Sequence, residues 1–236
     1  MISDVGNVFF RYRNSLLPVA CVLLLLPGAD PFPDPMGAAF VGGAVAVLGQ
    51  LIRAATIGLR YVVRGGRNRR VYAEDLVTDG IYAHLRNPMY VGNLMIASGL
   101  AIASNSWTVI VVALPLGFFI YASIVAAEEQ YLAARFGARF EAYCRAVPRW
   151  LPRLTGLGRT LSSMQFHWRR LLLKEYGTPF GWMSVLVLMT LYNIWMSDQW
   201  MARTGDVHTL KTVFVTTFLL WLLAWSIKRT RYLVAD

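Results

Sequence analysis

The sequence predicts an all-α membrane protein with about six transmembrane helices. Hydrophobic residues make up 56% of the 236 residues and charged residues only 15%, respectively above and below the values of soluble domains. The apolar residues fall in long blocks, several of which approach the roughly 20 residues that cross a bilayer as a helix. Basic residues gather between alternate blocks, as they do on the cytoplasmic side of polytopic membrane proteins.

Six apolar blocks are the candidate spans. The first is short, and acidic, proline-rich sequence follows it instead of a signal-peptide cleavage pattern. The second carries Ala38, Gly42 and Ala46 on one face, which favours close helix packing. Only Asn105 and Ser106 join the third block to the fourth, which predicts a tight antiparallel hairpin. In chain order the spans comprise residues 16–27, 36–59, 89–104, 107–127, 179–195 and 210–227.

The charges predict that both termini are cytoplasmic. The segments on that side hold 20 of the 23 Lys and Arg residues, and the three others are Arg53, Arg203 and Lys211. The net charge of +10 then reflects topology and attraction to anionic lipid headgroups, and no soluble basic module remains to bind nucleic acid. The cytoplasmic segments comprise residues 1–15, 60–88 with the Gly- and Arg-rich loop 64–70, 128–178 and 228–236.

The same division gives four parts: a first span and loop (1–35), a core with three spans (36–154), an amphipathic interfacial helix (155–178) and two additional spans (179–236). Near the end of the core, apolar residues recur at steps of three and four, interrupted at Gly137 and ended at Pro148. We expect this stripe to pack on the protein itself or on the membrane. It consists of Leu132, Phe136, Phe140, Tyr143 and Val147.

Two polar clusters lie at the edges of apolar spans, in residues 76–92 and 128–149. The second begins with the adjacent carboxylates Glu128 and Glu129, which are costly at membrane depth and therefore indicate a function. A helix that starts at Trp107 and rises about 1.5 Å per residue reaches Glu128 after about 30 Å. The hairpin thus predicts that the acidic pair returns to the depth of Asn87.

Asn87 and Pro88 are typical of an N-cap and a first helical residue. Unpaired backbone N–H groups and the positive end of a helix dipole would then lie beside Arg86. Tyr82 and Tyr90, on either side of this helix start, offer aromatic faces to a cation or a ring. Together these groups predict an amphipathic ligand site that faces the cytoplasm.

The partner of the acidic pair stays open at this point. A buried carboxylate is stabilised by a fixed cation, either a protein arginine or a cationic ligand. In the first case Glu128 and Glu129 pair with Arg86, Arg135 or Arg145 and only lock this end of the protein. In the second case at least one of them holds the cationic part of a cofactor.

Cysteine and histidine usage predicts no metal site. Cys21 lies in the first span and Cys144 on the cytoplasmic side, so both are expected to be free thiols. Neither has a His or Cys neighbour at ligand spacing, and the three histidines are scattered along the chain.

Four motifs occur in order: Leu-Val-Thr-x-Gly-x-Tyr, Arg-Asn-Pro-x-Tyr-x-Gly, Glu-Glu-x-x-Leu-x-x-x-Phe-Gly-x-x-Phe-x-x-Tyr and Val-Pro-Arg-x-x-Pro. Over about residues 36–152 this pattern resembles the isoprenylcysteine carboxyl methyltransferase and phospholipid methyltransferase family of integral membrane enzymes. The matching residues are Leu76, Val77, Thr78, Gly80 and Tyr82; Arg86, Asn87, Pro88, Tyr90 and Gly92; Glu128, Glu129, Leu132, Phe136, Gly137, Phe140 and Tyr143; and Val147, Pro148, Arg149 and Pro152.

The resemblance implies a cytoplasm-facing cofactor site for S-adenosylmethionine, and a membrane lipid or a prenylated molecule as methyl acceptor. Arg86 and Glu129 are the candidate catalytic residues. A carboxylate and aromatic faces suit the sulfonium cation, and methyl transfer gains mainly from positioning. The implied cofactor-binding residues are Leu76, Val77, Tyr82, Asn87, Pro88, Met89, Tyr90 and Glu128.

Two departures from the family pattern leave the acceptor open. Asn87 replaces the usual histidine, and Ile124 stands where prenylcysteine-methylating members resemble one another in carrying an arginine for the acceptor carboxylate. An amine acceptor such as phosphatidylethanolamine would instead need a base, for which Glu129 and His84 are candidates. The alternative functions are a nicotinamide-dependent sterol-type reductase and a non-catalytic lipid-binding or scaffold protein. The oligomeric state is not predicted.

Overall fold

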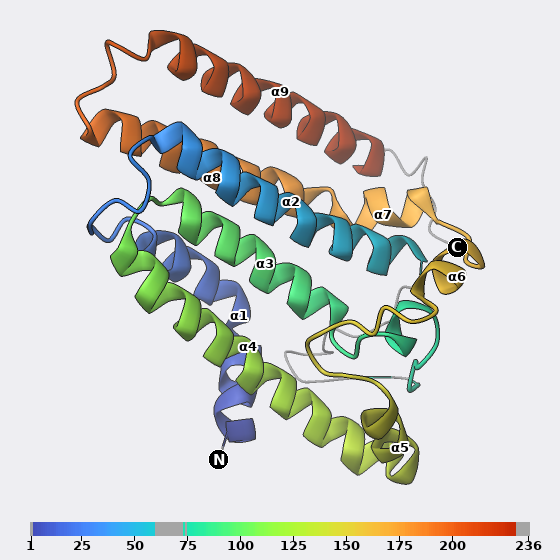
Figure 1. The fold of residues 1–236 in the computed structure, drawn as a ribbon. Helices are drawn as coiled ribbons and strands as arrows, with labels where there is room; N and C mark the ends of the chain where they lie inside the picture. The colour runs from blue at the N-terminus through green and yellow to red at the C-terminus, as the bar shows by residue number, and fades with distance from the viewer. Residues whose placement is uncertain (1, 60–72, 74, 230–236) are drawn as a thin grey trace.

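The computed structural model describes residues 2–59, 73 and 75–229, which form helices and no β-strand (Figure 1). The predicted loop 64–70 lies outside the described residues. In chain order the helices are α1 (Ile2–Leu23), α2 (Pro35–Leu59), the 3-10 helix η1 (Gly80–Ala83), α3 (Pro88–Ala103), α4 (Trp107–Phe136), α5 (Ala138–Ala146), α6 (Leu157–Ser162), α7 (Trp168–Glu175), α8 (Gly177–Met196) and α9 (Thr204–Arg229).

Four of these helices, α2, α4, α8 and α9, are long and apolar enough to cross a membrane, which makes this an integral membrane protein. The apolar helix α3 is shorter, with 16 residues. These five helices match the five spans predicted after residue 35. Most bounds agree within a few residues, but α4 continues beyond its predicted end and α9 begins before its predicted start. The total of six spans stays a prediction.

The first predicted span differs from the structure. In place of a span over residues 16–27, α1 runs from Ile2 to Leu23. Its polar first half is helical because it packs along α4: a Cβ built on Gly6 would lie only 1.9 Å from the carbonyl oxygen of Ser123. Packing of this kind stabilises helices that hydropathy alone does not reveal.

Small residues bring α2 and α3 into close contact at the centre of the bundle. Ala38 and Ala46 are fully buried, and Gly42 lies so close to α3 that an added Cβ would be 2.3 Å from the carbonyl oxygen of Gly99. The predicted small-residue face is therefore confirmed. α4 and α1 lie on one side of this pair, and α8 and α9 lie on the other (Figure 1).

The predicted hairpin between α3 and α4 is also confirmed. Asn105 adopts a left-handed φ of 53°, and the Ser106 hydroxyl accepts a hydrogen bond from the backbone N–H of Val109 at 3.4 Å. The Asn105 amide accepts from the backbone N–H of Phe32 and donates to its carbonyl oxygen, both at 3.0 Å. The turn is thus anchored to the loop between α1 and α2.

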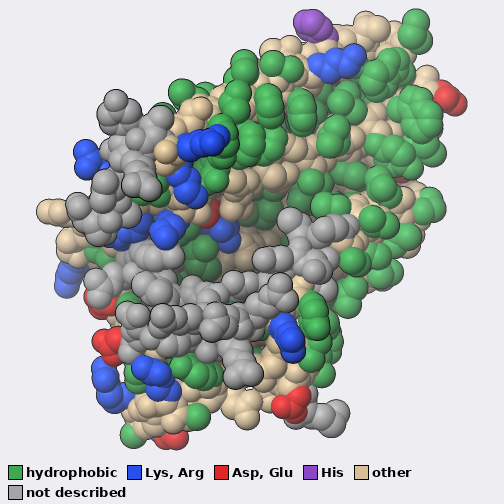
Figure 2. Space-filling view, turned by 180° about the vertical axis from the view of Figure 1, so that it is seen from behind, with side chains coloured by type: hydrophobic (Ala, Val, Ile, Leu, Met, Phe, Trp, Pro, Cys, Tyr) green, Lys and Arg blue, Asp and Glu red, His purple; other side chains and the backbone are tan. Residues whose placement is uncertain are grey.

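Basic side chains gather toward the end of the molecule that carries η1, α6 and α7, whereas hydrophobic side chains cover most of the remaining face (Figure 2). In this region the sequence predicts one amphipathic helix over residues 155–178, but the structure has two short ones, α6 and α7. The chain between them docks on α2, because the backbone N–H of His167 donates to the carbonyl of Gly58 at 2.9 Å. Phe166 packs against the same glycine.

Candidate functional site

The two polar clusters meet where α3 begins, as the hairpin predicts. Tyr90 lies in the first turn of α3, and its hydroxyl donates to Oε1 of Glu128 on α4 at 2.5 Å. Glu128 is only 7% exposed. Glu128 is therefore a buried carboxylate held by a short hydrogen bond.

Glu129 forms ion pairs with two arginines. Nη1 of Arg86 lies 3.0 Å from Oε1, and Arg149 binds both carboxylate oxygens, with Nε 3.1 Å from Oε1. The protein-arginine alternative therefore holds for Glu129, with Arg149 in place of Arg135 or Arg145. Arg149 belongs to the Val-Pro-Arg motif, which was the sequence signal for its presence in the site.

Asn87 precedes α3 as predicted, but its side chain does not cap the helix. Its Nδ2 instead donates to the carbonyl oxygen of Arg149 at 3.3 Å. The backbone N–H of Arg86 donates to the carbonyl of Pro148 at 3.0 Å, and that of Arg153 to the carbonyl of His84 at 2.9 Å. The chain before α3 is therefore held by the chain after α5, which draws the Asn87 amide away from the helix end.

The helix break at Gly137 directs α5 back over the site. Gly137 has φ 51° and ψ −128°, a conformation that favours glycine because a Cβ would be strained there. After this bend, the Tyr143 hydroxyl donates to the carbonyl of Tyr82 at 2.8 Å. The predicted apolar stripe packs on the protein itself, in a cluster with Ala73 and Leu76; its buried members are Leu132, Phe140, Tyr143 and Val147.

A small pocket lies between the two clusters. Arg86 is one of its lining residues, and Nε of Arg86 is buried with no hydrogen-bond partner among the described residues. Next to it, Nη1 of Arg86 contacts Sγ of Cys144 at 2.8 Å, and burial raises the pKa of the Cys144 thiol, which the charge of Arg86 opposes. The pocket is lined by Arg86, Asn87, Glu128, Glu129, Leu132, Phe140 and Tyr143.

The other residues implied by the resemblance surround this pocket at different depths. Leu76 and Tyr82 are buried, and Val77 packs against Tyr82 and Ile81. Pro88 is fully buried in the first turn of α3, beside the half-buried Met89. The structure thus brings Arg86, Asn87, Tyr90 and the acidic pair together directly. Leu76 instead packs in a cluster with the pocket-lining residues Leu132, Phe140 and Tyr143, and Tyr143 also bonds the carbonyl of Tyr82.

His84 has both ring nitrogens engaged. Nδ1 lies 2.8 Å from the carbonyl oxygen of Arg153, so it donates, and Nε2 lies 2.8 Å from the hydroxyl of Thr160. The ring is buried and joins η1 to α6. This arrangement is that of a structural histidine.

The fold and the paired clusters define a polytopic membrane protein with a buried polar site at the end of its helices. Residues 38–139 match the phospholipid methyltransferase family. The chain is 33% identical over 111 residues to the protein-S-isoprenylcysteine O-methyltransferase of Schizosaccharomyces pombe, covering 44% of this chain and 45% of the relative. It is 30% identical over 169 residues to the nickel-cobalt-cadmium resistance protein NccN of Alcaligenes xylosoxydans xylosoxydans, covering 70% of this chain and 76% of the relative.

A third relative, the cobalt-zinc-cadmium resistance protein CzcN of Cupriavidus metallidurans, is 33% identical over 49% of this chain and 53% of the relative. The chain thus spans about half the length of two of these three relatives. No solved structure matches it. The chain belongs to the isoprenylcysteine carboxyl methyltransferase and phospholipid methyltransferase family.

Two of these relatives are named for metal resistance. In the part of the chain that the structure describes, no group of three His, Cys, Asp or Glu side chains is placed to hold a metal ion. The polar chemistry of the described site is that of carboxylates paired with arginine and tyrosine.

Proposed function

We propose that this protein is a membrane methyltransferase that uses S-adenosylmethionine to methylate a membrane lipid or a prenylated acceptor at the cytoplasmic interface. The observation that carries the proposal is the buried Tyr90–Glu128 pair beside the Arg86–Glu129 ion pair, in a chain of this family. Together the pairs offer two carboxylates and a guanidinium at the edge of the apolar spans, so groups of both signs are present for a cofactor with cationic and anionic parts.

The residues present fit this cofactor. Glu128 and the ring of Tyr90 suit a sulfonium cation, because a desolvated carboxylate and an aromatic face both attract positive charge. The unpartnered Nε of Arg86 and the backbone N–H groups at the start of α3 suit an anionic group. When bound, S-adenosylmethionine supplies an electrophilic methyl group. Leu76 packs with pocket-lining residues and Tyr82 is hydrogen-bonded by one of them, so both are close enough to shape the rest of the cofactor site, with Val77 packed against Tyr82.

Arg86 and Glu129 act in this proposal as a pair. Two arginines hold the Glu129 carboxylate, so it orients Arg86 toward the pocket region and is poorly placed to remove a proton. His84 is equally engaged. The acceptor head would therefore be oriented by Arg86, after entry from the lipid. Ile124 is 2% exposed and offers no charge to a carboxylate acceptor.

The first experiment measures S-adenosylmethionine binding to the full chain in detergent by calorimetry. Glu128→Gln removes the charge at the same size, and we expect affinity to fall about 10-fold to 100-fold, as for a lost hydrogen bond to a charged group. Glu141→Gln removes an exposed carboxylate of α5 and serves as the matched control. Equal binding by wild type and Glu128→Gln, or none by wild type, refutes the assignment.

The second experiment tests the reaction. Membranes are incubated with methyl-labelled S-adenosylmethionine, and the labelled lipid or polypeptide is identified. Label in a lipid or prenylated molecule that depends on Glu128 supports the proposal. Binding of NADPH instead of S-adenosylmethionine would favour the reductase alternative, and cofactor binding without any labelled product would favour a non-catalytic lipid-binding protein.

A further inference from the structure

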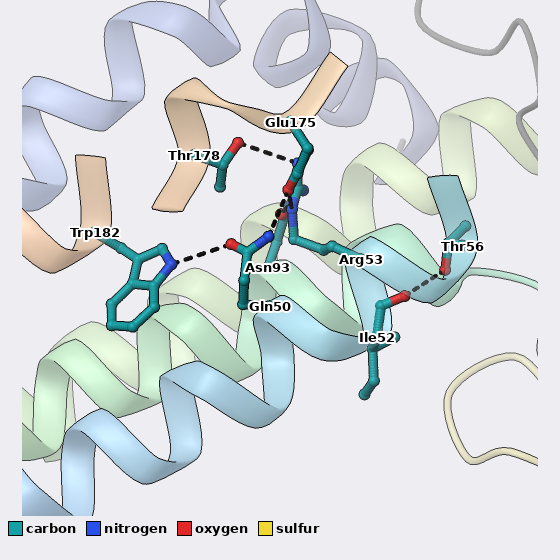
Figure 3. A network of polar contacts seen from close by, with 8 residues as sticks. All are labelled: Gln50, Ile52, Arg53, Thr56, Asn93, Glu175, Thr178 and Trp182. Carbon is teal, nitrogen blue, oxygen red and sulfur yellow. Dashed lines mark hydrogen bonds and ion pairs between the residues drawn. The ribbon is translucent and has the colours of Figure 1, made fainter. Parts of the chain in front are cut away.

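A second buried polar network lies deeper in the bundle, centred on Arg53 of α2 (Figure 3). Its guanidinium forms a bidentate ion pair with Glu175 at the end of α7, with Nε 2.5 Å from Oε1 and Nη2 2.8 Å from Oε2. Glu175 is 3% exposed. A charged pair this well buried in a membrane protein requires nearly complete hydrogen bonding to be stable.

One side of the network ties α2 to the C-terminal helices. Gln50 donates to Oε1 of Glu175 at 3.1 Å and accepts from Nε1 of Trp182 on α8, also at 3.1 Å. The hydroxyl of Thr178 accepts from Nη2 of Arg53 at 3.4 Å. Figure 3 shows Glu175 and Thr178 beside Arg53, with Trp182 reaching the network through Gln50.

The other side of the network leads to the candidate site. Nη1 of Arg53 donates to Oδ1 of Asn93, which lies one turn beyond Tyr90 on α3. The rings of Tyr121 and Tyr90 lie with their centroids 5.6 Å apart. Tyr90 in turn holds Glu128. Through Arg53, the C-terminal helices are therefore tied to the part of α3 that carries Tyr90, the residue that donates to Glu128.

We propose that Arg53, Asn93 and Tyr121 are positioning residues that hold the Tyr90–Glu128 pair in place, with Glu175 coupling the C-terminal helices to that pair. This inference rests on the proposed function for its readout. Arg53 does not line the pocket, and each of its guanidinium nitrogens already has a partner. It therefore acts through its neighbours and not on a ligand directly.

The physical basis is the freedom of a tyrosine ring. Unsupported, the Tyr90 side chain could take other rotamers, and its hydroxyl would leave Glu128. Contact with the Tyr121 ring restricts that motion, and the hydrogen bond from Arg53 to Asn93 fixes the part of α3 that carries Tyr90. Preorganisation of this kind lowers the ordering cost that ligand binding would otherwise carry.

The test uses Asn93→Leu, which keeps the size of the side chain and the Arg53–Glu175 pair but removes the oxygen that accepts from Arg53. We expect the dissociation constant for S-adenosylmethionine to rise about 5-fold, as for the loss of one hydrogen bond. Thr56→Val is the matched control, because the Thr56 hydroxyl is buried three residues from Arg53 and bonds only the carbonyl of Ile52 (Figure 3). Glu175→Gln is the second variant and should act in the same direction.

Coupling to Glu128 separates positioning from general loosening of the fold. In a Glu128→Gln background, Asn93→Leu should change affinity by less than about 2-fold, because two residues that act through one contact are not additive. A 5-fold loss in both backgrounds, or an unchanged dissociation constant for Asn93→Leu and Glu175→Gln in the wild-type background, overturns this inference. Failure of the wild-type protein to bind S-adenosylmethionine overturns the proposed function instead.

Discussion

The contact between α2 and α3 gives the sharpest stability prediction, because it leaves no room for a methyl group. A Cβ built on Gly99 would lie 2.3 Å from the carbonyl oxygen of Gly42, and 2.8 Å from the backbone nitrogen of Ala46. Ordinary van der Waals contact begins at 3.4 Å, so in Gly99→Ala the two helices must separate by about 1 Å, the difference between these distances.

The magnitude follows from two opposing effects. Overpacking of a tight interface costs about 1–3 kcal/mol, whereas alanine in a helix is favoured over glycine by up to about 1 kcal/mol. Gly117→Ala isolates the second effect, because Gly117 lies within α4 with no atom within 4 Å of its added Cβ. The difference between the two variants is thus the packing cost, equivalent to roughly 2–12 °C in melting temperature for a chain of this size.

The assay is thermal unfolding in detergent, followed by tryptophan fluorescence. We expect Gly99→Ala to unfold several degrees below Gly117→Ala, which should match or exceed wild type. The double variant with Gly42→Ala should lose less than the sum of the single variants, because the first separation makes room for the second Cβ. If Gly99→Ala is as stable as Gly117→Ala, the close approach of α2 and α3 is wrong.

Three further predictions concern the site. Arg86→Lys should reduce the initial rate of methyl transfer about 10-fold, and Arg149→Lys should reduce it less. Both arginines hold Glu129, but the Arg86 side chain is 13% exposed and that of Arg149 is 44% exposed. A larger loss for Arg149→Lys than for Arg86→Lys contradicts this reasoning. Cys144 should be alkylated slowly at neutral pH and faster as pH rises, because burial raises its pKa and so disfavours the thiolate; mass spectrometry over a pH series measures this, and rapid labelling at pH 7 would refute it. His84→Ala should lower the melting temperature through the loss of two hydrogen bonds of about 1 kcal/mol each while transfer persists, and a folded variant without any transfer would restore His84 as the base.

Helix positions were largely predictable because hydropathy and turn residues report them directly. Asn105 and Ser106 placed the hairpin between α3 and α4, and that hairpin in turn placed Glu128 beside the start of α3. The first half of α1 was not predictable, since its helicity depends on packing against Ser123. For the same reason the break between α6 and α7 was missed, because it arises from docking on Gly58.

Which residues belong to the site was easier to predict from the sequence than which of them pair with one another. The motifs indicated Arg86, Asn87 and the acidic pair, which do surround one pocket. Which arginine meets Glu129 depends on the bend at Gly137 and the return of the chain after α5, and neither follows from spacing along a helix. The sequence shows Arg53 within a predicted span but does not identify the residue that pairs with it. A cation within a predicted span needs a partner, but its partner Glu175 is distant in the chain.

The site extends beyond the segment that matches the family, which bears on how the C-terminal part of the chain contributes. The match ends at residue 139, yet the backbone of Arg86 is held by Pro148, and the Asn87 side chain by the carbonyl of Arg149. The deeper network adds Glu175, which is buried against α2 beyond both. If the helices after residue 154 served only to span the membrane, they would not need a buried ion pair with the core, such as the one between Glu175 and Arg53. The Arg53–Glu175 pair indicates instead that their position and that of α3 are fixed together.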